Sequence, residues 1–80
     1  MITEVIVLKM RGVLSSHIDA FGWEAGVLEV WMKNGWGYRY RGTTEEQYHS
    51  LFVNSDFGRN FNRLKPLLPA PEKFRLDLHP

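Results

Sequence analysis

The sequence predicts a small α+β domain, in which a meander sheet of three to four antiparallel strands packs on one face against one helix and a short second helix. Two patterns lead to this expectation. Residues 16–40 alternate apolar and polar side chains and are interrupted by two turn segments, Glu24-Ala25-Gly26 and Lys33-Asn34-Gly35. Beyond residue 43 the apolar residues recur at intervals of three and four, which indicates helix.

The composition fits one folded domain. The chain has 80 residues, of which 44% are hydrophobic and 24% are charged, as is typical of a small globular protein. Ten Lys and Arg residues against nine Asp and Glu residues give a net charge of +1, so any affinity for a polyanion has to come from local clustering. The absence of cysteine excludes disulfides, thiolate metal ligands and a cysteine nucleophile.

The sequence predicts a cytoplasmic protein that does not contact a membrane. No apolar run approaches the roughly 18 residues that a membrane span requires. The first residues, Met1-Ile2-Thr3-Glu4, lack the charged and then apolar pattern of a signal peptide.

The ends of the chain flank a central unit, residues 13–65. Thr3 to Met10 is β-branched and mostly apolar, so residues 1–12 are expected to form an N-terminal strand extension that Arg11-Gly12 ends. Residues 66–80 carry all four prolines and are expected to form a tail, in which residues 73–78 are a candidate late strand.

The register of the meander follows from its turns. If each turn is a three-residue loop with glycine in third place, the apolar residues of neighbouring strands face each other. In the second hairpin, Leu28 then lies opposite Tyr40 and Val30 opposite Tyr38. In the first hairpin the same rule pairs Gly22 with Leu28, Ala20 with Val30, and Ile18 with Met32. The expected core face therefore holds these residues: Ile18, Ala20, Leu28, Val30, Met32, Trp36, Tyr38 and Tyr40.

The helical part begins at a hydroxyl cap. Thr43-Thr44 precedes two acids in the first turn, where the helix dipole favours them. Tyr48, Leu51 and Phe52 form one apolar stripe that is expected to pack on the core face. Residues 54–56 stop this helix, and Asp56 is expected to cap a second helix that ends before Pro66.

An ordered series of short motifs resembles the KTSC domain, a module named for its occurrence at the C-terminus of some lysyl-tRNA synthetases. The series runs from Val13 to about Lys65 and comprises Ser15-Ser16-His17-Ile18, Phe21-Gly22-Trp23, residues 28–35, Tyr38-Arg39-Tyr40 and Gly58-Arg59-Asn60-Phe61-Asn62. The chain departs from the family pattern at Thr43-Thr44, where the family has Val-Pro, and at Asp56, where it favours serine. The resemblance implies a stand-alone bacterial or phage protein that binds RNA.

The face opposite the expected core carries the first candidate binding surface. It is expected to present Trp31 beside Arg39 and Arg41, with Phe21 and Trp23 as interface candidates. Exposed aromatic rings stack on bases and guanidinium groups bind phosphate, as in single-strand binders. The alternatives are that the first strand or the tail covers this face, or that a second copy of the chain does so in a homodimer. Asp19 and Glu29 on the same face oppose phosphate binding.

Two further groups are binding candidates. Tyr38 and Tyr40 alternate with Arg39 and Arg41 and would stack on bases, unless both tyrosines belong to the core. Arg59, Arg63 and Lys65 form the densest cluster of cations, which would bind phosphate or simply cover the end of a solvated helix.

No residue pattern indicates catalysis, a cofactor or a metal. His17, His49 and His79 lack the spacing of metal ligands, and Ser15-Ser16 lacks the surroundings of an activated nucleophile. The sequence therefore predicts a non-enzymatic binding domain for RNA or single-stranded nucleic acid. The rival prediction is a small protein-interaction module, encoded by a phage or mobile element, that sequesters a host protein or a nucleotide signal.

Overall fold

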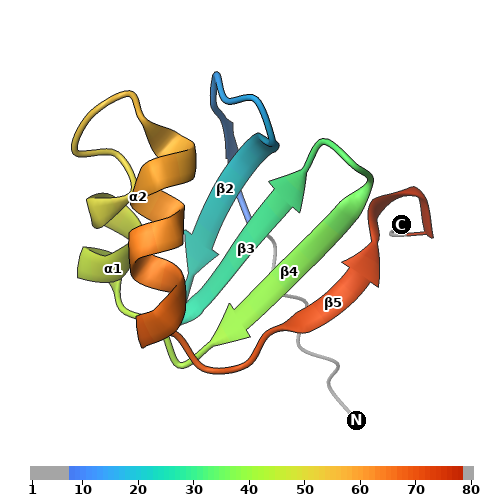
Figure 1. Cartoon of the computed structure of the whole chain (residues 1–80). Helices are drawn as coiled ribbons and strands as arrows, with labels where there is room; N and C mark the ends of the chain where they lie inside the picture. The colour runs from blue at the N-terminus through green and yellow to red at the C-terminus, as the bar shows by residue number, and fades with distance from the viewer. Residues whose placement is uncertain (1–7, 79–80) are drawn as a thin grey trace, which may run out of the picture.

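A computed structural model describes residues 8–78, which form a five-stranded antiparallel sheet and two helices (Figure 1). The predicted α+β class is confirmed, whereas the expected three to four strands are corrected to five, in the order β1-β2-β3-β4-β5. The elements are β1 (Met10–Gly12), β2 (Ile18–Glu24), β3 (Val27–Met32), β4 (Trp36–Arg41), α1 (Glu45–Ser50), α2 (Phe57–Leu64), a 3-10 turn (Lys65–Leu67), β5 (Glu72–Arg75) and a second 3-10 turn (Leu76–Leu78).

The hairpin between β3 and β4 has the predicted register. Val30 pairs with Tyr38 and Leu28 with Tyr40, so the apolar side chains of both strands share one face. Gly35 closes the loop with a φ of 89°, a left-handed conformation that glycine adopts without steric cost.

The predicted register between β2 and β3 is wrong at Gly22 and Ala20. The turn has only two central residues, Ala25 and Gly26, both with positive φ as in a type I′ turn, whose twist matches that of the strands. Gly22 therefore pairs with Glu29 rather than Leu28, and Ala20 with Trp31 rather than Val30. The sequence analysis expects a three-residue loop with Gly26 in third place. In the structure Ala25 shares the left-handed conformation with Gly26, and these two residues alone form the turn.

This one-residue shift moves two candidate residues to the other face. Phe21 now pairs with Val30 and Trp23 with Leu28, so both lie on the helix side of the sheet, and the expectation that they join Trp31 on the opposite face is corrected. A bulge at Asp19 then restores the predicted pairing of Ile18 with Met32. The helix side thereby gains an aromatic core.

The edge strands differ from the expected extension and tail. Most of the expected strand over residues 3–10 lies outside the described residues. β1 begins at Met10 and includes Arg11-Gly12, which were expected to end a strand. The Pro-rich segment contributes β5, which pairs with β4 through Gly37 and Phe74 among others. Within residues 8–78 no helix combines the length and apolar character needed to cross a bilayer.

Both helices pack on the same side of the sheet and begin at the predicted caps. The side chain of Thr44 accepts a hydrogen bond from the Gln47 backbone, and Gln47 returns one to the Thr44 backbone. The Asp56 carboxylate caps α2. In Figure 1 the two helices lie toward β2, while β4 and β5 extend beyond them.

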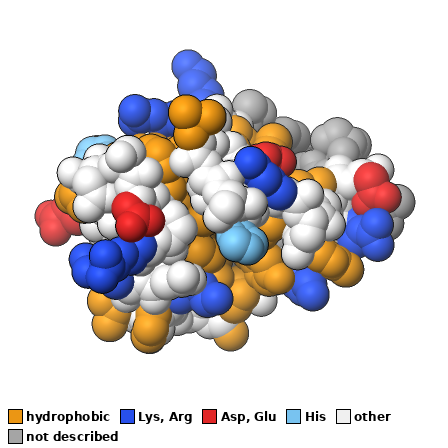
Figure 2. Space-filling model, turned by 45° about the horizontal axis from the view of Figure 1, so that its top comes forward, with side chains coloured by type: hydrophobic (Ala, Val, Ile, Leu, Met, Phe, Trp, Pro, Cys, Tyr) orange, Lys and Arg blue, Asp and Glu red, His pale blue; other side chains and the backbone are white. Residues whose placement is uncertain are grey.

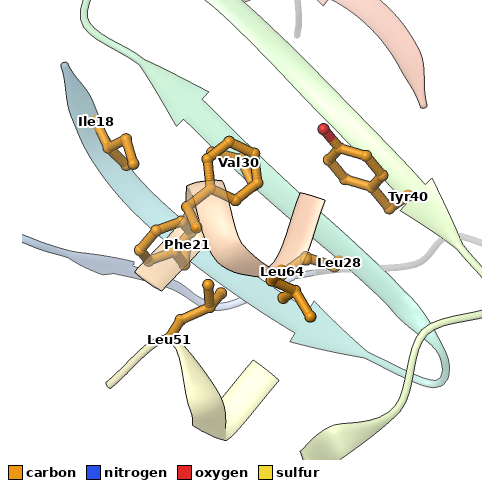
Figure 3. Close-up of a cluster of buried hydrophobic side chains, with 8 residues drawn as sticks. Ile18, Phe21, Leu28, Val30, Tyr40, Leu51 and Leu64 are labelled. Atoms are coloured by element: carbon orange, nitrogen blue, oxygen red, sulfur yellow. The ribbon is translucent and has the colours of Figure 1, made fainter. Parts of the chain in front are cut away.

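The helices bury an aromatic and aliphatic core against the sheet (Figure 3). Phe21 lies at its centre and is fully buried, with its ring 5.8 Å from that of Phe52 and 6.0 Å from that of Phe61. Leu51, the C-cap residue of α1, is also fully buried, as the predicted stripe requires. The side of the sheet on which this core lies is called the helix side below, and the other is called the back side.

Candidate functional site

The back side of the sheet holds Trp31, Arg39 and Arg41, and each of these side chains interacts with a glutamate. Glu29 is only 4% exposed, and its two carboxylate oxygens accept hydrogen bonds from the Trp31 indole at 2.9 Å and from Arg39 Nε at 3.1 Å. Glu72 on β5 lies 3.6 Å from Arg39 and accepts a 2.6 Å hydrogen bond from Arg41. The cross-strand pair of Glu29 and Arg39 is therefore part of a ladder of alternating charges.

This charge ladder accounts for two shifted pKa values. The hydrogen bond from Arg41 lowers the pKa of Glu72, and the same bond raises the pKa of Arg41. Arg39 and Arg41 thus have carboxylate partners already, and a phosphate would have to compete with those partners. The back side consequently offers a poor platform for a polyanion.

Arg39 is expected to stabilise the fold rather than to bind a ligand. Replacing Arg39 with alanine leaves the Glu29 charge buried without its main partner, which should lower the free energy of unfolding by about 2–4 kcal/mol. Arg41→Ala is the control, because it removes the same charge from an exposed pair and should change stability far less. Urea unfolding of both variants measures the difference, and equal effects would contradict the structural role of Arg39.

The helix side has a groove between α2 and β4. Its larger part has a volume of about 320 Å³, at the low end for small-ligand sites, and is lined by Met32, Tyr38, Tyr40, Phe61, Lys65 and residues 68–71. A second hollow of about 260 Å³ shares Met32, Phe61 and Lys65 with it and continues toward His17. No residue that lines either hollow is acidic.

A row of aromatic side chains leads from the floor of this groove along β4. Trp36, Tyr38 and Tyr40 alternate along the strand, so all three lie on the helix side. Lys73 of β5 holds its ammonium 4.1 Å from the Trp36 ring centre and 6.0 Å from that of Tyr38. Arg75 lies 5.0 Å from the Trp36 ring and pairs with Asp77.

The cations of this surface are less neutralised than those of the back side. Within residues 8–78 no carboxylate lies within ion-pairing distance of Lys65 or Lys73. Figure 2, which shows the helix side and the top of the molecule, has hydrophobic side chains at the surface with separate Lys and Arg side chains among them. We call the lining of the groove together with Trp36, Lys73 and Arg75 the groove surface.

The groove surface includes only part of the predicted site. It brings together Tyr38, Tyr40 and Lys65, and it excludes Trp31, Arg39 and Arg41. Arg59 and Arg63 are exposed on α2. Arg59 follows Gly58 and Arg63 follows Asn62, and Gly58 and Asn62 line the second hollow. Phe21 is buried in the core, whereas Trp23 is half-buried and donates a hydrogen bond to Thr43.

Sequence reasoning missed the contribution of the tail to this surface. Lys73 and Arg75 were placed in a candidate strand but not among the binding residues, and Trp36 was assigned only to the core face. The available signal was the alternation of Lys73, Phe74 and Arg75, which places two cations on one face of a strand. Pairing of that strand with β4 could not be read from the sequence.

No family model matches the chain, and no curated protein matches it. The groove surface therefore has to be interpreted from its own chemistry.

Proposed function

We propose that this protein binds single-stranded nucleic acid, RNA in particular, on the groove surface. The observation that carries the proposal is the row of Trp36, Tyr38 and Tyr40 flanked by two lysines that have no acidic partner within the described residues. Aromatic rings beside cations that no described carboxylate neutralises suit a strand whose bases stack and whose phosphates alternate with them.

Stacking is the first component of binding. Trp36 and Tyr38 are half-buried, so their rings are held by the fold while part of each remains accessible. Sequence-tolerant stacking on such rings contributes roughly 1–3 kcal/mol per base. Neither hollow has a closed shape or a cluster of ionisable groups that would indicate catalysis, which favours a binding role.

Charge is the second component. Lys65 and Lys73 lie on either side of the groove, and Arg59 and Arg63 on α2 add exposed positive charge beside it. The net charge of +1 gives little long-range attraction, so the affinity should depend on these local contacts. The proposed membership of the KTSC family, with its expected RNA binding, agrees with this function.

A protein partner is the rival, and the salt dependence of binding separates the two. Fluorescence anisotropy of a labelled random single-stranded RNA should show binding that weakens steeply as salt rises from about 50 to about 200 mM. Lys65→Ala and Lys73→Ala should each weaken binding severalfold and reduce the salt slope by about one.

Lys9→Ala is the matched control for these two variants. Lys9 carries the same charge but lies beside β2 and β1, at the sheet edge opposite β5. The control should bind like the wild type. Absence of binding at low salt would refute the proposal, and equal loss in all three variants would show that binding does not involve the groove surface.

A further inference from the structure

We infer that the groove between α2 and β4 accepts one base of the bound strand edge-on, and that the Tyr40 hydroxyl donates a hydrogen bond to an acceptor on that base. This inference rests on the proposed function and adds a base-reading site to it. It gives Tyr40 a different role from Trp36 and Tyr38, whose rings serve as the stacking surface.

The first support is the position of the Tyr40 hydroxyl. Tyr40 as a whole is 4% exposed, and its ring packs edge-on against Phe61 with centroids 6.2 Å apart. Figure 3 shows its oxygen pointing away from Leu28 and Leu64, at the margin of the core cluster. Tyr40 also lines the larger hollow of the groove.

The second support is that this hydroxyl has no partner within residues 8–78. No hydrogen bond joins it to a described residue, and no described buried side-chain oxygen or nitrogen lacks a partner. The hydroxyl must therefore be accessible from the groove rather than sealed in the core. A polar group at the end of a nearly buried ring gains most from a ligand that supplies the missing hydrogen bond.

The shape and chemistry of the groove suit a planar, partly apolar group. Apolar side chains form most of the walls, namely Met32, Phe61, Leu68, Pro69, Ala70 and Pro71. Lys65 lies at the rim and is the cation closest to the phosphate of an inserted nucleotide, since it lines both hollows. Mostly apolar walls with a small number of polar groups and a nearby cation are typical of sites that bind small planar ligands and bases.

The protonation state of Tyr40 suits a donor. Burial, followed by the neighbouring Tyr38, raises the pKa of Tyr40 above its ordinary value of 10.0. The hydroxyl consequently keeps its proton across the physiological range. Acceptors on the base edges, such as carbonyl oxygens, are the matching groups.

The test compares base-containing and abasic strands for the wild type, Tyr40→Phe and Tyr48→Phe. Eight-residue homopolymers of A, U and C and an abasic strand of equal charge are measured by anisotropy at low salt. Tyr40→Phe should bind the preferred homopolymer roughly three- to tenfold more weakly, the effect of one lost hydrogen bond, and should bind the abasic strand like the wild type. Tyr48→Phe makes the same chemical change at a ring that packs on Phe52 and lines neither hollow, so it should preserve both the affinity and the preference.

The other outcomes separate failure of the base-reading site from failure of the proposed function. If Tyr40→Phe retains the wild-type affinity for every homopolymer while wild-type binding remains salt-dependent, the base-reading site is refuted and the proposed function stands. If the wild type binds no strand at low salt, both fail. If Tyr40→Phe also loses affinity for the abasic strand, the substitution has damaged the fold, and the inference is overturned. Thermal unfolding of Tyr40→Phe measures such damage directly.

Discussion

A Phe21→Ala variant is expected to lose about 3–5 kcal/mol of unfolding free energy, the typical effect of truncating a fully buried phenylalanine. Phe21 is 0% exposed and contacts the ring of Phe52, which follows α1, and the ring of Phe61 in α2. Domains of this size have a small reserve of stability, within the roughly 5–15 kcal/mol of natural proteins and toward its lower end. The variant should therefore be largely or partly unfolded at physiological temperature.

Urea or thermal unfolding followed by circular dichroism measures this effect. Leu14→Ala is the control, because Leu14 is 93% exposed and its truncation should leave stability nearly unchanged. The result also tests the register between β2 and β3. A three-residue loop at residues 24–26 would place Phe21 on the back side, where truncation would cost far less, so a mild effect would contradict the two-residue turn.

A Trp36→Ala variant is expected to show the largest loss of strand binding among single substitutions on the groove surface. Removal of one stacking ring should weaken binding roughly five- to 150-fold, from the 1–3 kcal/mol that each stacked base contributes. The substitution also frees Lys73, which packs 4.1 Å from the Trp36 ring and would lose its fixed position.

Trp36→Phe and Trp31→Phe make this prediction specific. Trp36→Phe keeps an aromatic ring at the site and should recover most of the affinity. Trp31→Phe removes the indole that bonds to Glu29 on the back side, so it should lower stability without lowering affinity for the strand. If Trp31→Phe weakened strand binding more than Trp36→Ala did, the binding site would have to lie on the back side of the sheet.

Local patterns were sufficient for most of the fold. The caps at Thr44 and Asp56, the stripe through Leu51 and the hairpin that Gly35 closes all depend on residues close in sequence. Each is a short-range rule with a single physical cause, such as a side-chain oxygen that satisfies a free backbone N–H group. These elements were therefore correctly predicted.

The fold was predicted wrongly where the sequence allowed two turn types and where strands distant in sequence pair. At Ala25 the left-handed conformation is unfavourable for a residue with a Cβ, and only the two-residue turn, whose twist suits the hairpin, explains why the chain adopts it. That turn moved Phe21 into the core. The pairing of β5 with β4 is a long-range contact that joins Gly37 to Phe74, and no local signal specifies it.

The candidate site was predictable only in its residue types. The sequence offered aromatic side chains and cations as binding candidates, and the structure places Tyr38, Tyr40 and Lys65 on one surface. The choice between the two faces depended on the register and on the acids of the back side. Glu72 neutralises two of the predicted arginines and comes from the tail, which was treated as outside the domain.

The three tryptophan indoles provide the most direct test of the groove surface. They lie in different places: Trp36 on the groove surface, Trp31 against Glu29 on the back side, and Trp23 bonded to Thr43. We expect a proton–nitrogen NMR titration with a single-stranded RNA to shift the Trp36 indole signal and leave that of Trp31 in place. A shift confined to the Trp31 indole, or none at saturating RNA, would contradict binding on the groove surface.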